Sequence, residues 1–99
     1  MPYELLLTDQ PESVLARLPA HLLNVVEKHL SLLAEHPATL SRPVVSPPYP
    51  PGGQMYYFKH VDTEGTAHHF TVLFHYASDE ATLVITGVSY LPGPMPGDP

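Results

Sequence analysis

The chain has 99 residues, with four Lys or Arg against ten Asp or Glu, a formal net charge of -6 and no cysteine. A chain this short forms one hydrophobic core, and without cysteine it has no disulfide framework and no thiolate metal site. The negative charge argues against strong nucleic-acid binding, because phosphate backbones are repelled. Its apolar runs fall far short of the roughly 20 residues that span a bilayer, and its N-terminus lacks the features of a secretion signal. We therefore expect a cytoplasmic protein without membrane contact.

The N-terminal third predicts one strand and two helices. Residues 3–8 alternate weakly, and Thr8 or Asp9 can then cap a helix whose first turn accepts Pro11. Apolar residues recur at spacings of three and four between residues 14 and 33, which is the period of one helical face. Pro19 divides this segment, because proline is tolerated in a first helical turn but not in a helix interior. The second helix should end before Pro37.

Two segments are dominated by proline and glycine. Residues 37–53 show no periodicity and predict an extended loop, which could be a solvated linker, an ordered wrap or a Pro-rich ligand surface. Residues 92–99 can form neither a helix nor a sheet ladder, so we expect a disordered tail. A single domain should therefore cover residues 1–91, with the Pro-rich loop inside it.

After residue 53 the apolar period changes to two. Residues 54–62, 67–77 and 82–90 are rich in aromatic and β-branched side chains and predict three strands. Short turns at residues 63–66 and 78–81 can only join antiparallel neighbours. The predicted fold class is α+β, in the order β-α-α-β-β-β, with two helices packed on one face of an antiparallel sheet.

Four-residue turns would pair His60 with His69 and His69 with Tyr90, which assigns every strand residue to a face. One face is then expected to form the core with these residues: Phe70, Val72, Phe74, Leu83, Ile85, Met55 and Tyr57. The other face is aromatic, rich in histidine and nearly uncharged, and it should hold these residues: Tyr56, Phe58, His60, His69, Thr71, Leu73, His75, Val84, Thr86, Val88 and Tyr90.

The row of His60, His69 and Tyr90 suggests proton transfer. Histidine titrates near neutral pH and can act as general base or acid when a 2′-hydroxyl attacks RNA, with tyrosine as a second donor. Lys59 is the only strand cation able to offset transition-state charge, although on this register it points to the other face. An ordinary half-exposed strand surface also carries His and Tyr, so the structural interpretation stays open beside the catalytic one.

We predict neither a metal nor another cofactor. A cross-strand pair of His60 and His69 supplies two zinc ligands, and no third ligand lies at the right position. His21, His29 and His36 recur along the second helix and are interpreted as a solvated flank.

The same predicted face also suggests a protein-binding surface. Its expected contact residues are these: Tyr56, Phe58, Leu73, His75, Val84 and Val88. A patch of this kind is larger than an isolated monomer normally exposes, so the Pro-rich loop, a second copy of the chain or a partner protein should cover it.

Several segments resemble the RelE/ParE toxin superfamily. They are Tyr3-Glu-Leu-Leu-Leu-Thr8, the helix opened by Leu18-Pro19, Phe70-Thr-Val-Leu-Phe-His-Tyr76, and Leu83-Val-Ile-Thr-Gly-Val88. The resemblance covers most of the chain and rests on element order and apolar pattern. It implies a type II toxin-antitoxin system, an antitoxin that wraps the chain with a helix or strand, and RNA recognition on the open side of the sheet.

The chain departs from that family in its charge. Toxins of this class have arginines where this sequence has Thr71 and Leu91, which leaves Lys59 as the remaining strand cation. Removing one such donor costs about two to three orders of magnitude in rate. Our leading hypothesis is a divergent toxin-family protein that acts by binding an antitoxin or a second copy of itself. The alternative is a weak ribonuclease that uses His60, His69, Tyr90 and Lys59, so whether the chain is an enzyme stays open.

Overall fold

The computed structural model describes residues 2–44 and 52–93. In chain order its elements are β1 (Glu4–Leu7), α1 (Asp9–Arg17), α2 (Ala20–Glu35), α3 (Pro37–Leu40), β2 (Arg42–Pro43), β3 (Gln54–Val61), β4 (Ala67–Tyr76) and β5 (Thr82–Pro92). The predicted α+β class is confirmed, and the short elements α3 and β2 lie within the predicted loop. Residues 45–51 of that loop and residues 94–99 of the predicted tail lie outside the described residues. No described helix is long and apolar enough to cross a membrane.

Prolines set the helix boundaries as the sequence predicts. Pro11 lies in the first turn of α1, and Leu18 leaves the helix with an extended backbone at ψ 142° before Pro19 caps α2. This is the conformation favoured by a residue that precedes proline. α2 ends at Glu35, and Pro37 then begins the separate helix α3.

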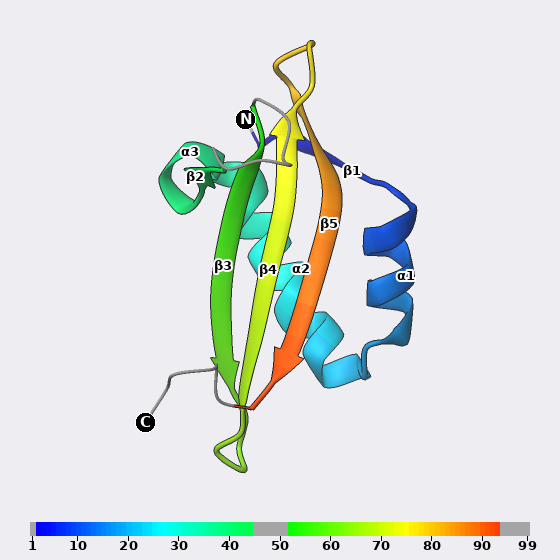
Figure 1. The fold of residues 1–99 in the computed structure, drawn as a ribbon, viewed down its shortest axis with the longest axis vertical. Helices are drawn as coiled ribbons and strands as arrows, with labels where there is room; N and C mark the ends of the chain where they lie inside the picture. Colours follow the sequence, from blue (N-terminus) through cyan, green and yellow to red (C-terminus); the bar gives the residue numbers. More distant parts are fainter. Residues whose placement is uncertain (1, 45–51, 94–99) are drawn as a thin grey trace.

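The sheet has the strand order β1-β5-β4-β3-β2. The predicted three-strand meander is present as β3, β4 and β5, and all its neighbours are antiparallel. The sheet as a whole is mixed, because β1 pairs in parallel with β5. A parallel pairing requires a long crossover, which the helices provide. Figure 1 shows α2 behind the sheet and α1 alongside β5.

The core lies between α2 and one face of the sheet. Leu22, Val26, Leu30 and Leu33 recur on one side of α2 and are all buried. They pack in a single cluster with strand side chains that include Phe70, Val72 and Phe74 of β4, and with Leu83 and Ile85 of β5. Full burial of one such side chain stabilises the fold by about 1.5–3 kcal/mol. We call this side of the sheet the helix face.

The register of β3 against β4 differs from the prediction by one residue. His60 pairs with His68, and Lys59 pairs with His69. The cause is the turn: the Asp62 amide donates to the Thr66 carbonyl, so the loop between them has an odd number of residues. Gly65 adopts a φ of 84° there, as expected at the left-handed position that ends such loops. A one-residue slip moves every side chain of β3 to the other face.

A second irregularity lies in the β4–β5 hairpin. Near the turn the predicted register is correct, since Phe74 pairs with Ile85. A bulge between Leu73 and Phe74 then shifts the rest, so that Val72 pairs with Val88 and Phe70 with Tyr90. A bulge inserts one unpaired residue and reverses the facing of the residues beyond it. Val88 and Tyr90 therefore lie on the helix face.

These shifts correct several predicted placements. Tyr56, Phe58 and Val88 are 6%, 5% and 1% exposed and belong to the core, so their predicted position on the uncovered face is wrong. Met55 and Tyr57 were predicted in the core but lie on the opposite face of the sheet, and Tyr57 is 43% exposed. The face opposite the helix face, which no described helix covers, is called the open face. On β3, β4 and β5 it carries Met55, Tyr57, Lys59, Val61, Ala67, His69, Thr71, Leu73, His75, Val84, Gly87, Ser89 and Leu91.

Candidate functional site

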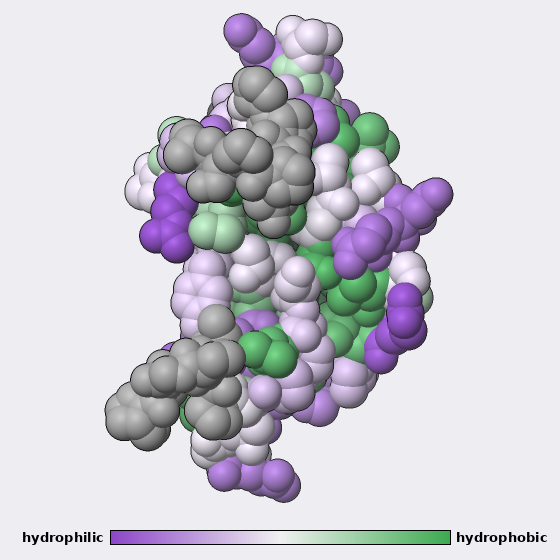
Figure 2. Space-filling view, viewed as in Figure 1, coloured by the Kyte–Doolittle hydropathy of each residue, from purple (hydrophilic) through white to green (hydrophobic). Residues whose placement is uncertain are grey.

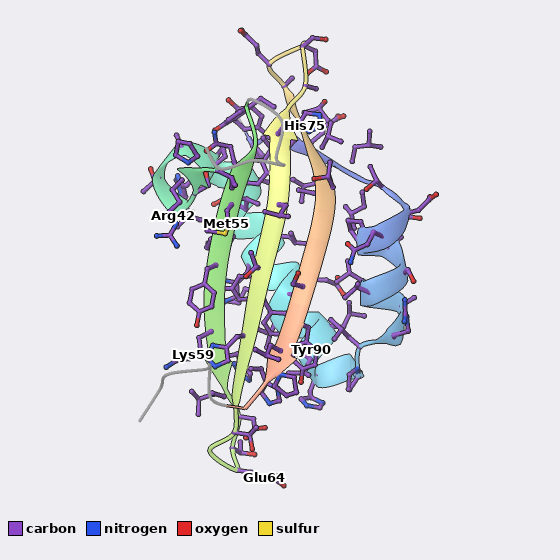
Figure 3. The ribbon with its side chains drawn as sticks, viewed as in Figure 1. Arg42, Met55, Lys59, Glu64, His75 and Tyr90 are labelled. Carbon is purple, nitrogen blue, oxygen red and sulfur yellow. The ribbon has the colours of Figure 1, made fainter. Side chains whose placement is uncertain are left out.

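The structure divides the four predicted catalytic residues between the two faces. Lys59 and His69 are direct cross-strand partners on the open face. His60 faces the helices opposite His68, and Tyr90 lies on the same helix face opposite Phe70. The predicted row of His60, His69 and Tyr90 is therefore wrong. Figure 3 shows Lys59 on β3 and Tyr90 on β5 near the sheet end that carries the turn with Glu64.

A histidine-tyrosine pair lies on the open face. The Tyr57 hydroxyl is 2.6 Å from Nδ1 of His69, and the two rings are stacked. Either the hydroxyl donates to a bare Nδ1 or a protonated Nδ1 donates to the phenol oxygen, depending on the tautomer. His69 is only 5% exposed, and its Nε2 has no hydrogen-bond partner in the described part of the chain. The pair thus has one unused polar atom beside the exposed Lys59.

The charges on the open face are few and positive. Among its positions on β3, β4 and β5 none is acidic, and Lys59 is the only lysine or arginine. Arg42 on β2 pairs with Met55, and directly opposed residues project to the same side of a sheet. Figure 3 shows Arg42 and Met55 toward the other end of the sheet from Lys59. A pocket of about 290 Å³ lies beside them and is lined by Leu40, Ser41, Arg42, Met55 and Tyr57.

The helix face carries a hydrogen-bonded chain of three titratable residues. His68 is buried, its Nε2 is 2.8 Å from Asp62 Oδ2, and its Nδ1 is 2.7 Å from the Tyr90 hydroxyl. An ionised carboxylate only accepts, so Nε2–H donates to Asp62. At Nδ1 a neutral ring accepts the Tyr90 proton, and a protonated ring donates to the Tyr90 oxygen. The bond from His68 holds the pKa of Asp62 below its usual value, assisted by the backbone amides of Thr66 and Glu64.

A histidine of α2 packs against the helix face and has a lowered pKa. His29 of α2 stacks on Phe58 at 3.9 Å, and its Nδ1 is 2.7 Å from the Tyr56 hydroxyl. Burial lowers the pKa of His29, and electrostatic repulsion from Lys28 and His60 lowers it further. Burial also raises the pKa of Tyr56. The predicted solvated position of His29 is therefore wrong, because its ring packs against β3.

Three residues with hydrogen-bonding roles were missed from the sequence: Tyr57, Asp62 and His68. Tyr57 was assigned to the core by the one-residue error in the β3–β4 turn, and Asp62 and His68 were given no role. The available signal was Asp62 followed by Gly65, because the aspartate can accept hydrogen bonds from the turn amides and the glycine can adopt a positive φ.

In residues 2–44 and 52–93 no group of three or more His, Asp or Glu is placed to hold a metal ion.

The sequence matches no protein-family model and no curated protein. Two solved structures are similar in fold. A chain of the toxin-antitoxin complex RelBE2 from Mycobacterium tuberculosis aligns with a TM-score of 0.69 and 21% identity, covering 92% of this chain and 100% of that one. A mutant of the E. coli toxin RelE in the free state aligns with a TM-score of 0.60 and 13% identity, covering 90% of this chain and 83% of that one. The chain therefore has the fold of the RelE toxins, as its resemblance to RelE/ParE toxins predicts.

Proposed function

We propose that this chain is a toxin-family component of a toxin-antitoxin system and that it acts by binding a partner protein on the open face of its sheet. Two facts support the proposal: a RelE fold over nearly the whole chain, and an open face suited to a protein. The composition of that face is the main support for the proposal.

Apolar side chains dominate the open face. Val61 and Leu91 are exposed, and Met55, Leu73 and Val84 are half-buried, so each gains from being covered. Removing apolar area from water stabilises a complex by about 25 cal/mol per Å² before the costs of association. Of the six contact residues predicted from the sequence, Leu73, His75 and Val84 remain on this face.

A phosphate backbone fits the open face less well. Thr71 and Leu91, where the resemblance predicts arginines, both lie on this face and carry no charge. Lys59 and the edge residue Arg42 are its only lysine or arginine residues on β2–β5. A nucleic acid of moderate length needs several such contacts, and each one lost removes part of the salt-dependent affinity.

The test uses the protein encoded next to this chain in its genome. We expect the two proteins to copurify after coexpression, and expression of the chain alone to slow bacterial growth. Leu73→Asp, at the centre of the open face, should abolish copurification. Leu32→Asp is the matched control, since Leu32 is an exposed leucine of α2. Loss of the complex in both variants, or in neither, would contradict binding through the open face.

A second candidate function is weak ribonuclease activity, favoured by the unpartnered His69 Nε2; this atom is buried, so the side chains over it must move before RNA can reach it. With Nδ1–H donating to Tyr57, a bare Nε2 can take the proton of a 2′-hydroxyl as it attacks phosphorus. The bond from phosphorus to the 5′-oxygen then breaks, and the Tyr57 hydroxyl can protonate that oxygen. Lys59 would offset the developing charge. His60 and Tyr90 cannot join these groups, because they lie on the helix face.

Purified protein should then cleave single-stranded RNA to a 2′,3′-cyclic phosphate and a 5′-hydroxyl. His69→Ala should remove this activity, and His60→Ala, on the other face, should keep it. Absence of cleavage by the unmodified chain, or equal loss in both variants, would eliminate this candidate.

A further inference from the structure

The outer edge of β5 is only partly paired. β1 covers β5 from Thr82 to Ile85, whereas β5 continues to Pro92. Further along this edge, the side chain of Gln10 from α1 takes the place of a neighbouring strand. Its Oε1 accepts from the Val88 amide at 2.8 Å, and its Nε2 donates to the Val88 carbonyl at 3.0 Å. A side chain of α1 therefore pairs with the backbone groups of Val88 at this edge.

The next residue that faces this edge is Tyr90. Alternate residues of a strand direct their backbone groups to the same side, so the N–H and C=O of Tyr90 point to the same edge as those of Val88. The other alternate set of β5 residues directs its backbone groups toward β4. Gly93 continues this set, and its amide donates to the Ala67 carbonyl at 2.8 Å. The N–H and C=O of Tyr90 have no hydrogen-bond partner among the described residues. Within residues 2–44 and 52–93, the edge of β5 thus ends in a donor and an acceptor without partners.

A groove lies beside this unpaired edge. It has a volume of about 280 Å³ and is lined by Val14, Arg17, Leu18, Pro19 and Tyr90. Figure 2 shows hydrophobic side chains gathered between the positions that β5 and α1 occupy in Figure 1. The Tyr90 ring is a fixed wall, because its hydroxyl is bonded to His68 and its face stacks on Phe70. A strand edge next to an apolar groove is a suitable site for an extended peptide.

Arg17 adds a charge requirement at the rim. Its Nε and one terminal nitrogen bond to Ser13 within α1, which fixes the direction of the guanidinium. No carboxylate forms a salt bridge with Arg17 in the described ranges. The rest of the guanidinium is thus available to an acidic group of a ligand.

We propose that this groove binds an extended segment of the partner protein, which adds one strand to β5 at Tyr90, inserts an apolar side chain against Leu18 and places a carboxylate on Arg17. The inference rests on the proposed function, since it takes the partner to be a protein. The unpaired donor and acceptor specify an extended segment, and the arginine specifies an acidic one. A nucleic acid would find one cation and an apolar lining.

Amide exchange measured by NMR on the purified complex with the neighbouring gene product tests the backbone pairing. The Tyr90 amide should exchange fast in the free chain and at least about tenfold more slowly in the complex, as expected for a newly paired strand amide. The Leu91 amide is the internal control, because it faces β4 and is already protected. Unchanged exchange of the Tyr90 amide in a stable complex would overturn the inference.

The charge contact has its own test. Arg17→Glu should weaken the complex about five- to tenfold, by lost attraction and added repulsion. Lys28→Glu, an exposed lysine of α2, should leave the affinity unchanged. A complex that is lost in Leu73→Asp but unaffected by Arg17→Glu would leave the proposed function standing and remove this inference. Absence of any complex would contradict both. Protection of the Tyr90 amide that rises with the concentration of the free chain would assign the groove to a second copy and overturn the inference.

Discussion

The hydroxyl of Tyr90 is 2.7 Å from Nδ1 of the buried His68, and this bond joins the end of β5 to the turn that begins at Asp62. The Asp62 carboxylate uses Oδ1 to hold the amides of Glu64 and Thr66 and Oδ2 to orient the imidazole. One histidine therefore fixes both the turn that sets the β3–β4 register and the tyrosine that lines the groove beside α1.

His68→Phe should destabilise the fold by about 1–3 kcal/mol, because the ring is kept while both of its hydrogen bonds are lost. Chemical denaturation at neutral pH measures the effect. His75→Phe is the control, since His75 is an exposed residue of the same strand. Equal destabilisation by the two variants would show that the bonds of His68 to Asp62 and Tyr90 contribute nothing specific.

The free energy of unfolding should fall as the solution is acidified from about pH 7.5 to about pH 5.5, and His29 should contribute to the fall. Burial first, and then Lys28 and His60, hold its pKa in the folded protein below the usual 6.5. As pH drops below that value the unfolded chain takes up a proton before the folded one does, so stability is lost. The contribution is fully present above the usual pKa.

The variant His29→Phe should reduce this dependence on pH, because phenylalanine can keep the stacking on Phe58 and does not titrate. His21→Phe, at an exposed position of the same helix, should leave the dependence as it is in the unmodified chain. The measurement is the denaturation midpoint of the unmodified chain and of each variant at the two pH values. An unchanged slope in His29→Phe would contradict a lowered pKa of the half-buried His29 imidazole.

Gly65→Ala should destabilise the β3–β4 hairpin by about 1–2 kcal/mol, because a left-handed backbone is costly for alanine. A Cβ at Gly65 would meet nothing within 4 Å, so the cost comes from the φ of 84° and not from a clash. Gly65→Asn should cost less, since asparagine tolerates this conformation. If alanine and asparagine proved equally neutral in thermal denaturation, Gly65 would not fix the turn.

The sequence was sufficient to predict the helices and the meander but not the two faces of the sheet. Pro11, Pro19 and Pro37 define the helix ends by removing amides and restricting φ. In β3, by contrast, Met55, Tyr56, Tyr57 and Phe58 are consecutive and large, so the apolar pattern fits either facing. The decision then depends on the loop length, and one residue reverses it.

The candidate site was predictable only in part for the same reason. Lys59 and His69 were named from the sequence, but their pairing follows from the odd loop at Gly65. Tyr90 was assigned to the wrong face because of the bulge opposite Leu73, for which the available signal was Gly87 inside β5, since an isolated glycine in a strand often marks a bulge.

Binding of a partner protein to the open face of the sheet can be measured by calorimetric titration of the neighbouring gene product into the purified chain. Leu73→Asp and Leu32→Asp are measured in parallel. We predict a stoichiometric complex with a negative heat-capacity change, as apolar burial requires, lost in Leu73→Asp and retained in Leu32→Asp. No binding to the unmodified chain, or full binding to Leu73→Asp, would contradict the proposed binding at the open face.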